Sequence, residues 1–262
     1  MNSTVRRLEL GVRAISSHGV DMQTAYEVNL WLHILTGALS LICVLIPLWA
    51  RKGGTLHCRV GWIFTGSMVV VSVTGFFIAV AWIAIPLEVK PLAPGATPEE
   101  LARQALSYRA TGPFFGLLSF MTAYSVWGGI SALKDLSNRG TIVAAFCTPI
   151  LITGLVVLTV GLYFGQVVFM IFGTAASAMA IRDLWRLRNA NPRTGRERII
   201  AHLNAMLGGT TAAATAFTVQ VVSRLTDVGF IKVAMWVGPA LLCMGTAAVF
   251  SRRLRSGRSQ GV

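Results

Sequence analysis

Histidine is the residue type in this sequence that is best suited to chemistry, and it occurs at positions 18, 33, 57 and 202. His33 lies in "LHILTG", His57 lies in the basic segment "RKGGTLHCRVG", and His202 lies in "AHLNAM". Neutral imidazoles bind metal ions, and two of them on facing helices can occupy both axial positions of a b-type haem iron. The histidines could therefore bind haem, bind a metal ion, or serve a purely structural role as hydrogen-bonding groups.

The elements that must position these histidines are membrane-spanning helices. The chain is 54% hydrophobic and only 13% charged, whereas an ordinary soluble domain is about 25% charged. Five long runs contain no Asp or Glu, and Lys232 is their only basic residue. Runs of this length cross about 30 Å of hydrocarbon as helices. These runs are 28–50, 60–87, 112–133, 141–181 and 229–251.

The sequence predicts an all-α integral membrane protein with seven transmembrane helices. The run 141–181 is about twice the length of one span, and "GLYFGQ" at 161–166 predicts a tight turn that divides it. The segment 199–222 is less apolar but carries no charge apart from His202. The predicted spans are 28–50, 60–87, 112–133, 141–161, 165–181, 199–222 and 229–251.

The distribution of Lys and Arg predicts the orientation of this seven-helix domain, 28–251. Short cytoplasmic loops accumulate basic residues, and seven spans with the N-terminus outside place most of the Lys and Arg on the cytoplasmic side. The C-terminal segment 252–262 then forms a basic cytoplasmic tail. The net charge of +13 suits anionic lipid headgroups at that face. No basic folded surface with stacking aromatics is present, so we expect no nucleic-acid partner; homo-oligomerisation stays open.

Two segments outside the spans carry helical patterns. Apolar residues recur at helical spacing in the N-terminal arm, 1–27, which predicts an amphipathic surface helix. The segment 97–109 begins with Thr97, Pro98 and Glu100, the pattern of a capping box. We expect this segment to form an outer-face amphipathic helix, acting as a connector or as a lid.

Depth in the membrane separates the histidines. At 1.5 Å per residue, His57 and His202 lie at similar depths near the inner surface, whereas His33 lies most of a bilayer away. Gly37 and Gly61 follow His33 and His57 by four residues, and the absent side chain one turn along could admit a flat macrocycle. The hypothetical haem site is therefore the pair His57 and His202, and a redox partner is implied only if haem is present.

The predicted sixth span is the most polar. Its polar residues share one helical face, which indicates either hydrogen bonding between helices or the lining of a path. No Asp or Glu lies inside any predicted span, which disfavours ion-coupled transport and leaves an enzyme without a positioned carboxylate. The residues of this face are Asn204, Thr211, Thr215 and Thr218.

Three segments also resemble a known family. "LHILTGALSL", "KGGTLHCRVG" and "AHLNAMLGGTTAAATAFTV" are similar to blocks of an uncharacterised family of bacterial multi-pass membrane proteins, domain of unknown function 2306. Cys58 stands where an arginine is common in the family. The resemblance implies a helical bundle in the bacterial cytoplasmic (inner) membrane and supplies no established activity. The matching positions are His33, His57, Arg59, Gly61, His202, Met206, Thr215, Ala216 and Phe217.

The leading functional expectation is a multi-pass inner-membrane protein with a structural or scaffolding role and no prosthetic group or metal. The alternative is a b-type haem electron-transfer protein that uses His57 and His202. A second alternative is a passive conduit or transporter lined by the polar sixth helix.

Overall fold

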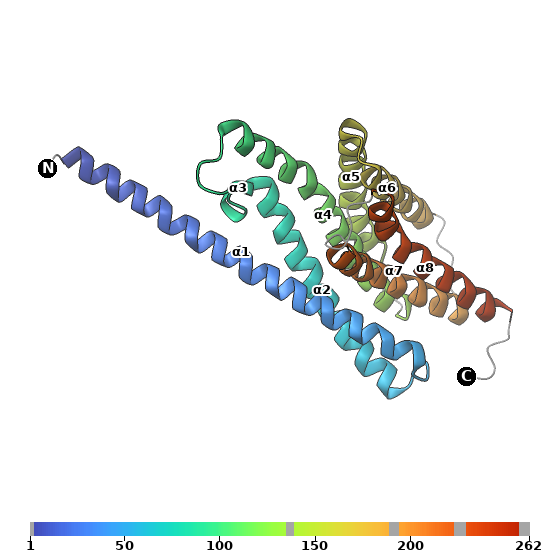
Figure 1. The fold of residues 1–262 in the computed structure, drawn as a ribbon. Coiled ribbons are helices and arrows are strands. Elements are labelled where there is room, and N and C mark those ends of the chain that lie inside the picture. Colours follow the sequence, from blue (N-terminus) through green and yellow to red (C-terminus); the bar gives the residue numbers. More distant parts are fainter. Residues whose placement is uncertain (1–2, 135–138, 189–193, 223–228, 257–262) are drawn as a thin grey trace.

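A computed structural model describes residues 3–134, 139–188, 194–222 and 229–256, and these segments form eight helices without a strand. The prediction of an all-α protein is therefore confirmed. The helices are α1 (Ser3–Trp49), α2 (Thr55–Ala84), α3 (Pro86–Val89), α4 (Pro98–Ala132), α5 (Arg139–Phe164), α6 (Val167–Arg188), α7 (Gly195–Val222) and α8 (Gly229–Arg255) (Figure 1).

Six of the described helices are long and apolar enough to cross a membrane, which supports a multi-pass membrane protein. They are α1, α2, α4, α5, α6 and α8. Helix α7, which carries the polar residues of the predicted sixth span, is not among the six.

The helices are arranged around α4. Helix α1 lies along α2, α2 lies along α4, and α4 also contacts α5 and α7 (Figure 1). Helices α5 and α6 form a closely packed pair, and α8 lies along α7. Helix α4 is thus shared by a group of α1, α2, α4 and α7 and a group of α4, α5 and α6.

The predicted helix 97–109 and the predicted span 112–133 are one continuous helix. The capping box is confirmed, because Thr97 Oγ1 accepts from the Glu100 N–H at 3.3 Å and a Glu100 carboxylate oxygen accepts from the Thr97 N–H at 2.8 Å. The helix then passes through Pro113, which sits inside α4. The segment 97–109 is therefore the first part of α4 rather than a separate helix.

The chain ends are also continuous with helices. The backbone of α1 begins at Ser3, so the predicted arm, 1–27, is joined to the first span without a break. Helix α8 continues to Arg255, into the predicted tail, 252–262, whose last residues lie outside the described segments. The boundaries differ because nothing at these junctions interrupts backbone hydrogen bonding.

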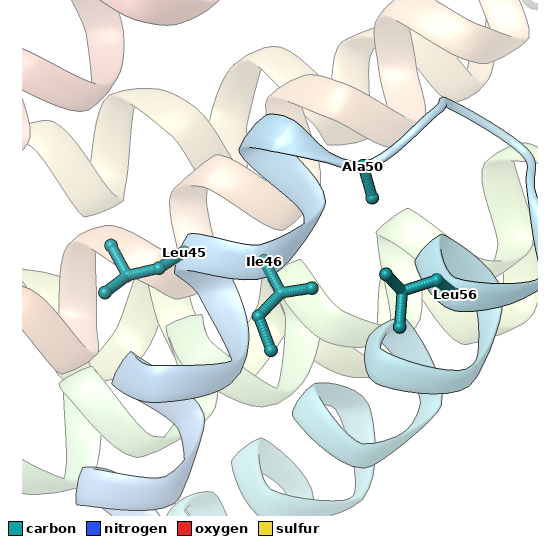
Figure 2. A pocket seen from close by; sticks show the side chains of 4 residues that line it. All are labelled: Leu45, Ile46, Ala50 and Leu56. Carbon is teal, nitrogen blue, oxygen red and sulfur yellow. The ribbon is translucent and has the colours of Figure 1, made fainter.

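Helices α1 and α2 are joined by a short basic turn. Gly53 has φ +73°, a conformation that favours glycine, and the Gly54 N–H donates to the Arg51 carbonyl oxygen at 3.0 Å. A shallow apolar hollow of about 390 Å³ lies beside this turn (Figure 2). The residues that line it are Leu45, Ile46, Ala50 and Leu56.

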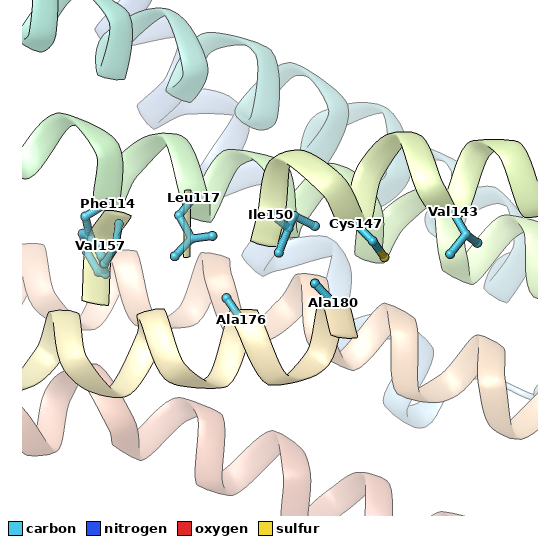
Figure 3. Packing of buried hydrophobic residues seen from close by; sticks show 8 residues of the cluster. All are labelled: Phe114, Leu117, Val143, Cys147, Ile150, Val157, Ala176 and Ala180. Atoms are coloured by element: carbon cyan, nitrogen blue, oxygen red, sulfur yellow. The ribbon is translucent and has the colours of Figure 1, made fainter. Parts of the chain in front are cut away.

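The largest apolar core lies between α4, α5 and α6 (Figure 3). Leu117 of α4, Ile150 of α5 and Ala176 of α6 are all fully buried there. Lipid tails are as apolar as these side chains, so burial alone does not hold helices together in a membrane. Close packing does so instead, and small residues such as Ala176 permit it.

The predicted turn at 161–166 is confirmed. Helix α5 ends at Phe164 and α6 begins at Val167, and Gly165 between them has φ +67°. The two helices then pack backbone against backbone: a Cβ on Gly173 would lie 2.7 Å from the Leu158 nitrogen and 2.8 Å from the Gly154 carbonyl oxygen. Glycine at 173 is what permits this approach.

Candidate functional site

The first candidate side chain, His202 of α7, is held by the backbone of α4. Its Nδ1 lies 2.7 Å from the carbonyl oxygen of Gly129. A carbonyl oxygen can only accept, so Nδ1 carries the proton and Nε2 of the neutral ring presents a lone pair. This bond from a ring N–H to a backbone carbonyl is the arrangement that orients metal-bound histidines.

His57 lies in the first turn of α2 and is half-buried. Its Nδ1 is fully buried and has no hydrogen-bond partner among the described residues. The imidazoles of His57 and His202 are near enough to interact electrostatically. Helices α2 and α7 therefore bring these two rings into one region.

Glycine and methionine define the surroundings of the pair. A Cβ on Gly129 would lie 2.6 Å from Cε and 3.0 Å from Sδ of Met206, so Met206 packs against this glycine one turn from His202. A Cβ on Gly61, one turn from His57, would meet no atom within 4 Å. A Cβ on Gly37 would reach only ordinary contact, 3.9 Å from Val71.

An apolar cluster lies deeper in the bundle than the histidine pair. Phe64 and Met68 of α2, Val126 of α4 and Ala213 of α7 are buried together there with Cys43 of α1. Along α2, His57 lies between this cluster and the basic α1–α2 turn.

The end of the bundle that carries this turn is defined by contacts between distant segments. The Lys52 ammonium lies 5.9 Å from the centre of the Phe250 ring on α8. The Arg196 guanidinium, at the start of α7, donates to the Arg255 carbonyl oxygen at 3.3 Å. We call this end, with the α1–α2 turn, the start of α7 and the end of α8, the basic end.

His33 is separate from the pair and joins α1 to α2. Its Nδ1 lies 3.0 Å from Thr74 Oγ1, and that hydroxyl donates to the Val70 carbonyl oxygen at 2.7 Å, so His33 is the donor. Asn29 donates to the Thr74 carbonyl oxygen at 3.0 Å. Thr74 lies about 25 Å along α2 from His57 at 1.5 Å per residue. His33 therefore cannot share a ligand with His57 and His202.

The polar residues of α7 have different partners. The hydroxyls of Thr211 and Thr218 donate to their own helix, to the carbonyl oxygens of Leu207 and Ala214 at 2.9 and 2.8 Å. The Thr215 hydroxyl is buried without a partner among the described residues. Asn204 is exposed, and its side-chain oxygen accepts from Ser251 of α8 at 3.5 Å.

Arg59, which belongs to the family pattern, is exposed on α2 beside the pair. It forms no salt bridge with a carboxylate of the described segments. No group of three or more His, Cys, Asp or Glu with the spacing of a metal site occurs within residues 3–134, 139–188, 194–222 and 229–256.

The sequence reasoning missed a polar contact between α4 and α6. Asp183 is largely buried, with a side chain 16% exposed, and it accepts from the Tyr124 hydroxyl and the Arg182 guanidinium, both at 2.9 Å. Asp183 follows the acid-free run 141–181 by two residues. The predicted span ended at 181 with the acid-free run, but α6 continues to Arg188 and so includes Asp183.

Comparisons of the chain with protein-family models, with curated proteins and with solved structures found no match.

Proposed function

We propose that the chain is a seven-span protein of the bacterial inner membrane, with α7 as the additional span, the N-terminus outside and the basic end in the cytoplasm. Helix α7 has 28 residues and lies between α4 and α8, two helices that are apolar enough to cross a membrane. The hydroxyls of Thr210, Thr211 and Thr218 donate to carbonyl oxygens of α7 itself, which lowers the cost of placing these residues in lipid. The positive-inside rule supports the orientation.

We propose further that His57 and His202 bind one b-type haem and that the protein transfers electrons. The observation that carries this proposal is the pairing of His202, whose Nδ1 is fixed by the Gly129 carbonyl, with His57, whose buried Nδ1 lacks a described partner. An unpartnered buried polar atom costs about 1–3 kcal/mol. Coordination to a haem iron would give the buried His57 imidazole a partner.

The residues of this chain have distinct roles in the proposed site. The Gly129 carbonyl fixes the tautomer and orientation of His202. The open space at Gly61 leaves room one turn from His57. The apolar cluster around Phe64 would exclude water from the deeper side of the proposed site. When bound, a haem would supply reversible one-electron exchange at its iron.

Two other functions are less well supported by the observed contacts. A conduit along α7 would need free polar groups, but Thr211 and Thr218 use their hydrogens on their own helix. A structural role without a prosthetic group gives no reason for the unpartnered His57 Nδ1. A redox partner is implied by the haem proposal.

The experiment is a reduced-minus-oxidised absorption spectrum of the full-length protein, purified in detergent after expression with ample haem. We expect sharp reduced bands and about one haem per chain, as a dedicated pair of axial ligands provides. A featureless spectrum under these conditions would favour the structural role over electron transfer.

A further inference from the structure

We propose that the α1–α2 turn forms a specific binding site for one anionic glycerophospholipid, with an acyl chain in the hollow beside the turn and the phosphate on Arg51 and Arg59. This inference is independent of the haem proposal, because it uses other side chains. It also goes beyond diffuse attraction of a basic surface to anionic headgroups, because it assigns one site.

The hollow has the surface of an acyl-chain site. Figure 2 shows Ile46 from α1 and Leu56 from α2 facing the same space, with Ala50 beside them at the end of α1. Every lining side chain is apolar, and the hollow opens outward beside two membrane-spanning helices. In a bilayer, such a surface is covered by hydrocarbon rather than by water.

Two arginines that neighbour the lining residues in the sequence can reach a phosphate beside the hollow. Arg51 directly follows Ala50, and Arg59 follows Leu56 by three residues, which puts it on the same side of α2. Side chains on a helix lean toward its N-terminus, so the long Arg59 side chain can reach back to the basic end. Both arginines are exposed.

Within the described residues, no carboxylate neutralises these two arginines. No Asp or Glu occurs between Glu27 and Glu88, and among the described residues neither Arg51 nor Arg59 forms a salt bridge. Lys52, by contrast, donates to the Pro47 carbonyl oxygen at 2.6 Å and so is used at the end of α1. A lipid phosphate next to the hollow would complement the charge of Arg51 and Arg59.

The test measures lipid retained by the full-length protein in native mass spectrometry after addition of phosphatidylglycerol or phosphatidylcholine with identical acyl chains. We expect the wild type to retain one phosphatidylglycerol in preference to phosphatidylcholine by roughly tenfold or more. The double variant R51Q/R59Q should lose this preference. The matched control R252Q/R253Q, which removes two exposed arginines at the end of α8, should keep it.

Two further arms separate the acyl chain from the headgroup. Leu56→Trp fills the hollow and should reduce retention of both lipids, and inorganic phosphate should fail to displace phosphatidylglycerol. Thermal unfolding of each variant shows that the fold is kept. Equal loss of preference in both double variants, no preference in the wild type, unchanged retention in Leu56→Trp, or displacement by inorganic phosphate would each overturn the proposed site.

Discussion

If the wild type binds haem as proposed, we expect His57→Ala and His202→Ala to purify without it and His33→Ala to keep the wild-type content. We expect the haem-to-chain ratio of His57→Ala and His202→Ala to fall at least about tenfold. A tenfold change corresponds to about 1.4 kcal/mol, and the loss of a ligand bond to iron costs more than that. His33 is spared because it bonds to Thr74 on the far part of α2. The measurement is the haem-to-chain ratio from absorbance after identical expression and purification.

Added imidazole distinguishes a variant that has lost only a haem ligand from a variant that has lost its fold. It should restore a reduced spectrum to His57→Ala and His202→Ala, because each variant keeps one ligand and gains a hole of the size of an imidazole. Wild-type haem content in both inner variants would contradict the assignment of the pair, and equal loss in His33→Ala would point to a general folding defect.

Gly173→Ala destabilises the protein by about 1–3 kcal/mol, the usual cost of overpacking a tight core. The new Cβ would lie 2.7 to 2.9 Å from backbone atoms of Leu158 and Gly154 on α5. Backbone atoms cannot move aside as a flexible side chain can, so α5 and α6 must separate. The measurement is the midpoint of thermal unfolding in detergent, followed by size-exclusion chromatography of heated samples.

Gly66→Ala is the matched control for this change. Gly66 lies inside α2, and a Cβ there would meet no atom within 4 Å. Alanine is favoured over glycine inside a helix by about 0.5–1 kcal/mol, so Gly66→Ala should leave the midpoint unchanged or raise it. If Gly173→Ala behaves in the same way, close backbone contact between α5 and α6 does not contribute to stability.

The sequence was sufficient for the helical class and for the elements whose ends carry strong local signals. Thr97 and Glu100 identified a helix start, and Gly165 identified the α5–α6 turn. The sequence was insufficient where one helix continues into another segment. Composition changes between 97–109 and 112–133, and Pro113 cannot donate a helical hydrogen bond, yet α4 continues through it without a break.

The candidate site was predictable in part. The sequence predicted that His33 lies apart from His57 and His202, and in the structure His33 contacts Thr74 on α2, 17 residues after His57. The bond from His202 to the Gly129 carbonyl could not be predicted, because it depends on how α7 packs on α4 and Gly129 lies in a glycine-rich segment like many others. The single polar face expected on α7 was derived from helical spacing, which cannot show that Thr211 and Thr218 bond to their own backbone.

The most direct test of the central claim, that histidines of α2 and α7 share one iron, is electron paramagnetic resonance of the oxidised wild-type protein with haem bound. We predict a low-spin ferric signal of the kind given by two axial imidazoles, because His57 and His202 would occupy both faces of the macrocycle. A high-spin signal from iron with one protein ligand, or the absence of any haem signal from protein expressed with ample haem, would contradict the account.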